Sequence, residues 1–291
     1  MKVLVTGAKG QLGYDVIKEL ARRGHSPIGV DIEEMDITDK TSVHTVLTDA
    51  LPDAVIHCAA WTAVDAAEDN IDKVRLVNVT GTENIAKVCN ELDIKMMYIS
   101  TDYVFNGEGT NYWEPDDANR QPLGVYGQTK YEGELAMENL LHKYFIVRIS
   151  WAFGVNGNNF IKTMLKLGKT RDQLTVVCDQ IGSPTYTFDL ARLLADMIET
   201  DRYGHYHATN EGICSWYEFA CEIFKQAAEL GYAEYDTNHL TVSPVSADHY
   251  PTKAKRPSNS RMSKEKLTAN GFTRLPSWQD AVKRYLKEIE F

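Results

Sequence analysis

The chain has 291 residues, of which 43% are hydrophobic, and its formal net charge is −10. This length supports one large domain or two smaller ones with full cores. The negative charge and the lack of a basic stripe exclude nucleic acid as a partner. No apolar run approaches the length of a membrane span, and a strand beginning at residue 2 leaves no room for a signal peptide, so we expect a cytoplasmic protein without a membrane partner.

The first elements of the chain form a dinucleotide-binding pattern. Residues 2–6 are predicted to be a buried strand, and a helix is expected over 11–23. Between them, Gly7 allows a tight turn, Gly10 lets the backbone approach a pyrophosphate at the positive end of the helix dipole, and Gly13 lets helix and strand pack closely. The alternative is an ordinary strand-to-helix turn, but a strand before the glycines and a helix after them is the context that the nucleotide motif requires.

The second predicted strand, residues 27–30, bears on the choice of cofactor. It ends at Asp31, where a carboxylate would accept hydrogen bonds from a ribose diol and repel a 2′-phosphate, which favours NADH. The alternative for Asp31 is a solvated carboxylate at a strand end. Lys9 in the glycine loop could approach a 2′-phosphate, so NADPH stays open.

Strand and helix alternate through the first half of the chain, with further strands expected at 54–58, 95–100 and 144–149 and helices at 40–50, 70–91 and 126–142. This alternation predicts an α/β fold of the Rossmann type, with a doubly wound parallel sheet that binds ligands at the carboxyl ends of its strands. The pattern then loosens, with helices near 158–169, 187–199, 215–230 and from 277, and strands at 174–178, 204–208 and 240–245. We expect a dinucleotide-binding domain of residues 1–150 plus about 186–210, and a smaller interleaved C-terminal substrate lobe of 151–185 and 211–291.

The catalytic signal lies between residues 97 and 130. Tyr126 and Lys130 are spaced to share one face at the start of a helix, where the ammonium would lower the pKa of the phenol. Thr101, at the end of the preceding strand, adds a hydroxyl. These three groups could donate a proton to a carbonyl oxygen or remove one from an alcohol. Tyr-x-x-x-Lys alone is weak, because most such pairs are solvated surface pairs.

Together these motifs resemble the extended short-chain dehydrogenase/reductases that act on nucleotide sugars, and within them the family of dTDP-4-dehydrorhamnose reductases. The resemblance extends over nearly the whole chain. Besides the glycine motif and the Tyr-x-x-x-Lys pair, its segments are Asp36–Asp39, Asn78, Ala59–Asp65, Ser100–Gly107, Ser150-Trp151, Gly157–Phe160, Asp179–Thr185 and Lys255–Pro257.

The resemblance implies that a reduced nicotinamide delivers hydride to the C4 ketone of dTDP-4-dehydro-β-L-rhamnose, a dTDP-4-keto-6-deoxy-L-hexose, giving dTDP-L-rhamnose for cell-surface polysaccharides. Tyr126 would donate the proton, Thr101 would hydrogen-bond the ketone oxygen, and Lys130 would hold the nicotinamide ribose. The implied cofactor site comprises Gly7, Gly10, Gln11, Leu12, Asp31, Asp36, Ile37, Ala59, Ala60, Thr62, Asn78, Tyr126 and Lys130. The implied substrate site comprises Val64, Thr101, Asp102, Tyr103, Tyr126, Trp151, Asn159, Gln180 and Arg256.

Three of these residues have alternative interpretations. Asn78 would support a proton-relay water near Lys130, or is a helix-surface amide. Trp151 would pack on the sugar, or seals the interface between the lobes. Arg256 is a plausible ligand of a diphosphate oxygen, or is purely structural.

Two questions stay open at the level of the sequence. Members of the family dimerise and some hold Mg²⁺ at the dimer contact, so a homodimer and bound Mg²⁺ are both possible, although no ligand cluster is legible. The other function classes are a different nucleotide-sugar reductase or epimerase, and a non-catalytic protein like the regulatory subunit of methionine adenosyltransferase. The intact Thr101, Tyr126 and Lys130 set counts against the latter.

Overall fold

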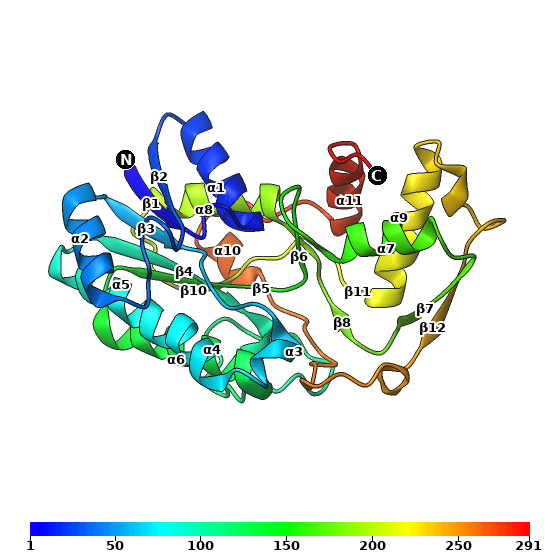
Figure 1. Cartoon of the computed structure of the whole chain (residues 1–291), viewed down its shortest axis with the longest axis horizontal. Helices are drawn as coiled ribbons and strands as arrows, with labels where there is room; N and C mark the ends of the chain where they lie inside the picture. The colour runs from blue at the N-terminus through cyan, green and yellow to red at the C-terminus, as the bar shows by residue number, and fades with distance from the viewer.

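Six short strands form the centre of the larger of two lobes, as shown by a computed structural model that describes residues 1–291 (Figure 1). They make a parallel sheet in the order β10-β5-β4-β3-β1-β2. Because helices cover both faces, most positions along the inner strands are buried, which explains why these inner strands lack polar alternation. The strands are β1 (Lys2–Thr6), β2 (Ser26–Val30), β3 (Ala54–His57), β4 (Lys95–Thr101), β5 (Tyr144–Ile149) and β10 (Gly204–His207). The predicted doubly wound parallel sheet is confirmed.

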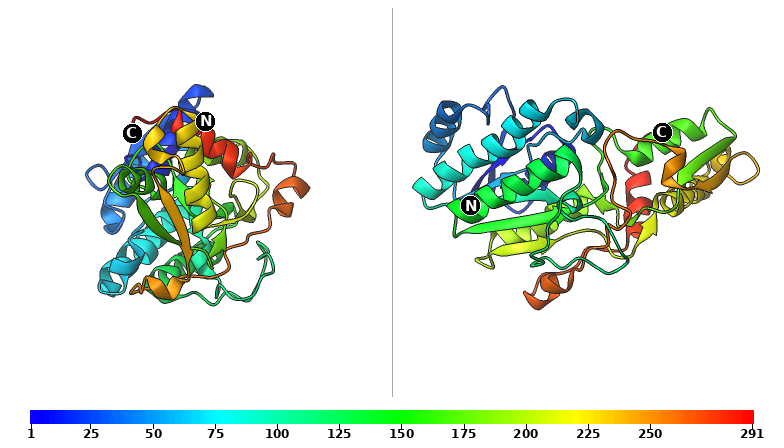
Figure 2. Two further views of the ribbon diagram at one scale, coloured as in Figure 1. Left: turned by 90° about the vertical axis from the view of Figure 1, so that its right-hand side faces the viewer. Right: turned by 90° about the horizontal axis from the view of Figure 1, so that it is seen from below.

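The helices of this lobe divide between the two faces of the sheet (Figure 2). α1 (Gln11–Arg22) packs with α8 (Thr187–Ile198) on one face, while α2 (Lys40–Ala50), α5 (Thr82–Glu91) and α6 (Gly124–Leu140) pack on the other. Successive side chains of a strand point to opposite faces. Val3 and Val5 of β1 accordingly join the α1 and α8 core, whereas Leu4 joins the α2 and α5 core.

A π-helical turn interrupts the helix expected over 70–91. α3 (Val64–Ala67) comes first, then α4 (Ile71–Arg75), the π turn η1 (Leu76–Gly81) and α5 in direct succession. Such single π turns inside helices occur mostly at functional positions. Here the turn contains Asn78, whose side chain is 1% exposed, so the alternative of a helix-surface amide is wrong.

The smaller lobe is built around aromatic side chains. Its main elements are α7 (Phe160–Gly168), β7 (Gln173–Val177), α9 (Trp216–Glu229), β12 (Thr241–Val245) and α11 (Trp278–Leu286), and β7 pairs in parallel with β12. Two-residue strands join the lobes: β6 (Ala152–Phe153) pairs with β9 (Thr185–Tyr186), and β8 (Ile181–Gly182) with β11 (Cys214–Ser215). Three short 3₁₀ turns complete the chain, η2 (Asp102–Val104), η3 (Ala233–Tyr235) and η4 (Ala247–His249).

One segment departs from the division expected at residue 211. α10 (Glu265–Ala269) and the residues after it return to the larger lobe, where Leu267, Phe272 and Leu275 share the core that contains Tyr206 of β10. Burial of these three apolar side chains against the sheet places this segment there, although it lies within 211–291. α8 and β10, from the 186–210 segment, belong to the sheet and core of the larger lobe. None of the helices combines the length and apolarity needed to span a membrane.

Candidate active site

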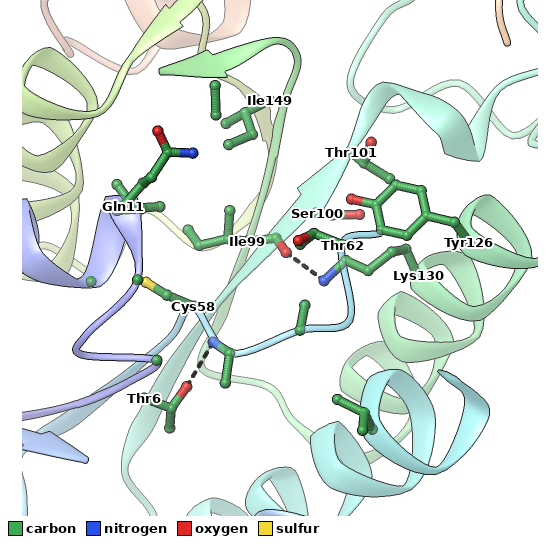
Figure 3. A pocket seen from close by; sticks show the side chains of 18 of the residues that line it. Thr6, Gln11, Cys58, Thr62, Ile99, Ser100, Thr101, Tyr126, Lys130 and Ile149 are labelled. Atoms are coloured by element: carbon green, nitrogen blue, oxygen red, sulfur yellow. Dashed lines mark hydrogen bonds between the residues drawn. The ribbon is translucent and has the colours of Figure 1, made fainter. Parts of the chain in front are cut away.

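The carboxyl ends of the parallel strands border a cavity of about 680 Å³ (Figure 3). It opens beside β1, which has β2 on one side and β3 on the other, so the chain leaves the sheet in opposite directions there. Such a switch point is the expected ligand site of a doubly wound sheet. The residues of the sequence prediction that line the cavity are Gly7, Gly10, Gln11, Leu12, Asp31, Asp36, Ile37, Ala59, Ala60, Thr62, Val64, Thr101, Asp102, Tyr103, Tyr126, Lys130 and Trp151.

The glycine loop has the shape that a pyrophosphate requires. Gly7 has φ +65°, and a Cβ on it would lie 2.9 Å from the backbone nitrogen of Ala59. A Cβ on Gly13 would lie 2.1 Å from the carbonyl oxygen of Gly7, so only glycine allows α1 to start this close to β1. No side chain caps α1 at Gly10, which leaves the first N–H groups of the helix available to an anion. The residues present therefore fit a dinucleotide.

The far end of the cavity, beyond β2, is acidic. The Asp31 carboxylate accepts a hydrogen bond from the backbone N–H of Lys9 at 2.7 Å. The Lys9 ammonium turns away to Glu33 at 2.5 Å and lies 3.8 Å from Glu34. Three carboxylates thus surround one ammonium here. Lys9 pairs with Glu33, so its ammonium does not lie free to meet a 2′-phosphate.

Asn78 braces the loop after β3 from beneath. Its Oδ1 accepts a hydrogen bond from the Trp61 backbone N–H at 2.8 Å, and its Nδ2 donates to the Trp61 carbonyl and to the Thr129 hydroxyl. Thr129 precedes Lys130 on α6. Asn78 does not line the cavity, and its amide bridges the loop of Ala59 and Ala60 to the catalytic helix.

Thr101, Tyr126 and Lys130 meet at the end of β4 (Figure 3). Thr101 and Lys130 are buried and Tyr126 is partly exposed, and the Lys130 ammonium donates to the Ile99 carbonyl at 2.7 Å. The same ammonium lies 3.9 Å from the centre of the Tyr98 ring, a cation–π contact from below. Burial lowers the pKa of Lys130 to about 7, against the opposing effect of Glu134.

The pKa of Tyr126 moves in the direction opposite to that expected from the sequence. Burial raises it well above its ordinary value, while the hydrogen bond with the Thr101 side chain lowers it, and Lys130 is not among the groups that shift it. Desolvation of the Tyr126 phenol outweighs the expected effect of the Lys130 charge for two reasons. The ammonium is held by the Ile99 carbonyl and the Tyr98 ring, and burial lowers the pKa of Lys130, so less of it is charged. A phenol that keeps its proton at neutral pH is suited to donate it.

Asp102 fixes the orientation of the Thr101 hydroxyl. The Thr101 hydroxyl donates to one carboxylate oxygen of Asp102 at 3.0 Å, and Ser260 donates to the other at 2.5 Å. Burial raises the pKa of Asp102 to about 6. Ser260 was missed at the sequence level, and no local signal could have found it, because it lies 158 residues away.

Trp151 lies both in the cavity and between the lobes. Its ring stacks on Trp216 of α9 with centroids 3.8 Å apart, and both indoles line the cavity. Its backbone has φ +50°, which turns the chain out of β5. The two roles considered for Trp151 are thus not exclusive. Trp216 was also missed, although the Ser-x-x-Glu capping box that starts α9 marks its position.

A second cavity of about 1190 Å³ lies in the smaller lobe and shares Trp216 with the first. Gln180 and Arg256 line it, and neither lines the first cavity. The Arg256 guanidinium donates to Asp65 at 2.6 Å and also hydrogen-bonds the Tyr103 side chain. The other cationic side chains that line this second cavity are Arg171, Lys253 and Lys255.

Asn159 lines neither cavity. It caps α7 by accepting from the Lys162 N–H, and its amide donates to Gln11, Gly154 and Tyr285. Asn159 therefore joins α7 to α1, the helix that follows the glycine loop, and does not lie where a substrate contact was expected. A helix N-cap uses the same residue type as a ligand contact, so the sequence could not separate the two.

Comparison with known proteins places this geometry in context. The model of the RmlD substrate binding domain matches residues 1–291. A dTDP-4-dehydrorhamnose reductase of Aggregatibacter actinomycetemcomitans is 40% identical, with 97% of each chain covered. The crystal structure of a dTDP-4-dehydrorhamnose reductase from Clostridium acetobutylicum has a TM-score of 0.93 and 39% identity, with 99% of each chain covered. That of the Bacillus anthracis enzyme in complex with NADP has a TM-score of 0.92 and 41% identity, with 99% of each chain covered.

Proposed function

The chain belongs to the RmlD substrate binding domain family, and on this premise we propose that it is an NAD(P)H-dependent oxidoreductase that reduces the C4 ketone of dTDP-4-dehydro-β-L-rhamnose. The product is dTDP-L-rhamnose, a precursor of cell-surface polysaccharide. The observation that carries the proposal is the meeting of Thr101, Tyr126 and Lys130 in the cavity that also holds the glycine loop. The family relatives named above are reductases of this substrate at about 40% identity.

The mechanism follows from the states of these side chains. When bound, the nicotinamide supplies the hydride. Tyr126 is protonated at neutral pH and gives its phenolic proton to the oxygen on which charge develops. Thr101 lies at the end of β4 beside that oxygen, and its hydroxyl stabilises the charge by turning its single proton from Asp102 to the oxygen. In its ammonium form Lys130 has two N–H groups left beyond its bond to Ile99, and these hold the ribose.

The proposed cofactor binding follows the lining of the cavity. The N–H groups at Gly10, Gln11 and Leu12 hold the pyrophosphate, and Asp31 holds the adenosine ribose. We propose a preference for NADH, because Asp31 is joined by Glu33 and Glu34, while Lys9 is paired with Glu33. A relative binds NADP, so NADPH is the competing cofactor in every test of this preference.

We place the dTDP group of the substrate in the second cavity and its sugar beside Trp151. Arg256, Lys253, Lys255 and Arg171 supply positive charge for a diphosphate. Trp216 lines both cavities, so a ligand that spans them passes its ring. Val64 and Tyr103, which line the first cavity, then frame the sugar side, and Gln180 lies with the dTDP group in the second cavity.

The alternatives are less well supported. An epimerase on this scaffold is matched by the Thermus thermophilus UDP-glucose 4-epimerase only in fold, at 18% identity. A non-catalytic regulatory subunit has no need of the proton donor Tyr126 and of Lys130 beside it. The reductase accounts for both cavities and for the catalytic groups.

Location, assembly and metal content complete the proposal. We propose a cytoplasmic enzyme, and the family resemblance supports testing for a homodimer and for Mg²⁺ at the contact between subunits. Within one chain, Glu134, Glu138 and His205 come close enough to share an ion, but Arg120 and Arg148 already pair with them, so these residues do not fit Mg²⁺. Sedimentation velocity with Mg²⁺ or with a chelator tests the dimer and the ion together.

One assay tests the function. The purified protein is mixed with dTDP-4-dehydro-L-rhamnose and either NADH or NADPH, and absorbance at the nicotinamide band is followed while NMR gives the configuration at C4 of the product. Loss of absorbance with formation of dTDP-L-rhamnose is expected. No oxidation with either cofactor, or release of tightly bound NAD on denaturation, would contradict the proposal.

A further inference from the structure

A buried ion pair lies directly behind the catalytic groups and takes no part in the mechanism above. Glu134 is on α6, one helical turn beyond Lys130, and Arg148 is on β5. Both side chains are fully buried, and the guanidinium donates to both carboxylate oxygens at 2.8 Å. Burial of two charges is costly even when they are paired, and apolar residues could fill the same space. A contribution to the free energy of unfolding therefore does not explain why an ion pair occupies this position.

A residue of β4, the strand that ends at Thr101, also binds this ion pair. Ser100 donates its hydroxyl to Glu134 at 2.5 Å and lines the cavity between its two neighbours. One neighbour is Thr101, and the other is Ile99, whose carbonyl holds the Lys130 ammonium. The Ser100 side chain thus connects the strand end that holds Thr101 to the helix that carries Tyr126 and Lys130.

We infer that Glu134 is a positioning residue: through Ser100 it holds β4 and α6 in the register that brings Thr101, Tyr126 and Lys130 together. The inference rests on the proposed reductase function. Arg148 in turn holds Glu134, and its remaining N–H groups reach the Pro115 carbonyl and His207.

The charge part of the inference concerns Lys130, which lies one turn before Glu134 on α6: the Glu134 carboxylate favours the ammonium form of Lys130. The titratable groups facing it are Tyr98 on β4, His57 and Cys58 at the end of β3, and Tyr126 and Glu134 on α6. Burial lowers the pKa of His57 to about 3 and raises that of Cys58 to about 12, so both are neutral at pH 7. Burial likewise raises the pKa of both tyrosines. Glu134, whose pKa is held low by Arg148 despite burial, is the one anion among them.

The test compares Glu134→Gln with Ser100→Ala and with Glu138→Gln. Glu138 lies one turn further along α6 and pairs with Arg120 and His205, and it lines neither cavity, so Glu138→Gln is the matched control. In Glu134→Gln we expect kcat for ketone reduction to fall about 10- to 100-fold with little change in KM, because misplacement of a catalytic group acts on the chemical step. The basic limb of the pH–kcat profile should move to lower pH by about one unit.

A second readout needs neither substrate nor cofactor. The ¹³Cε resonance of Lys130, assigned by its loss in Lys130→Met, is titrated by NMR in the protein alone. We expect its midpoint to fall in Glu134→Gln and to stay in place in Glu138→Gln. An unmoved midpoint in Glu134→Gln would overturn the charge part, whether or not the reductase assay of the wild-type protein succeeds.

Ser100→Ala decides the outcome if Glu134→Gln fails to fold, because it keeps the ion pair and removes only the link to β4. A fall in kcat of about tenfold at unchanged KM supports the inference. Unchanged kcat in Ser100→Ala, with a wild-type protein that is active, refutes the link and leaves the proposed function intact. Absence of wild-type activity refutes the proposed function instead.

Discussion

The buried ammonium of Lys130 should make the stability of this protein rise with pH. Its side chain is 2% exposed, and burial lowers its pKa from 10.5 to about 7. In the unfolded chain the lysine regains its ordinary value, so between pH 7 and 10.5 the unfolded state binds more protons than the folded state. Stability rises with pH wherever that holds. Below pH 7 both states are protonated and the full penalty applies, whereas above 10.5 both are neutral and it vanishes.

The size of the effect follows from the same two values. A difference of 3.5 units, from 10.5 to about 7, corresponds to about 5 kcal/mol over the full range. Between pH 7 and pH 9 the part released is about 2 kcal/mol, because half of Lys130 is already neutral in the folded protein at the lower limit. Buried thiols and phenols titrate in the opposite sense, since burial raises the pKa of Cys58 and Tyr126. Their contributions to the pH dependence of stability are therefore removed by comparing the wild-type protein with a variant in which only Lys130 differs.

Lys130→Met is that comparison, because it retains the length of the side chain and removes the charge. Urea unfolding of both proteins is measured at pH 7, 8 and 9 without cofactor, and the free energy of unfolding is extrapolated to water. The difference, wild type minus variant, should increase by about 2 kcal/mol over this range, with equal m-values. A difference that stays constant within about 0.5 kcal/mol would refute the argument that the Lys130 side chain is desolvated in the folded protein.

Three further predictions concern the cavity. Tyr126→Phe should retain the fold and nicotinamide binding but lower kcat by about 10²–10⁴-fold, and near-normal turnover in a steady-state assay would remove Tyr126 as proton donor. Asp31→Ala removes a ribose acceptor and one of three carboxylates, so the ratio of kcat/KM for NADH to that for NADPH should shift toward NADPH; an unchanged ratio would make Asp31 an ordinary solvated carboxylate. Trp151→Leu loses the stacked pair with Trp216, worth about 1 kcal/mol, so Tm should fall by only a few degrees while KM for the dTDP-sugar rises. A large loss of Tm at constant KM would show that Trp151 serves packing alone.

Much of the fold was legible in the sequence because its signals are local. The glycine spacing, the apolar runs of β1, β3, β4 and β5, and the helices between them each follow from neighbouring residues. The placement of Thr101 at a strand end and Tyr126 on the following helix then follows from the parallel topology, which brings carboxyl ends to one edge. The family resemblance added the substrate class, which spacing alone does not encode.

The tertiary structure decided what depends on burial and on partners far along the chain. Whether Lys130 lowers the pKa of Tyr126 depends on how much water either group retains, and helix spacing does not determine this. The bonds of Asp102 to Ser260 and of Glu134 to Arg148 join separate elements, so no window of sequence contains them.

The same reason separates Asn159 from Gln180 and Arg256. An asparagine, a glutamine and an arginine in loops look alike as ligand candidates. The first, Asn159, caps α7 and hydrogen-bonds Gln11 of α1, while the other two line the cavity of the smaller lobe. Local sequence therefore determined which elements form and where the strand ends lie. Long-range packing determined which polar groups remain free to act, because each buried hydrogen bond requires a partner that only the folded chain supplies.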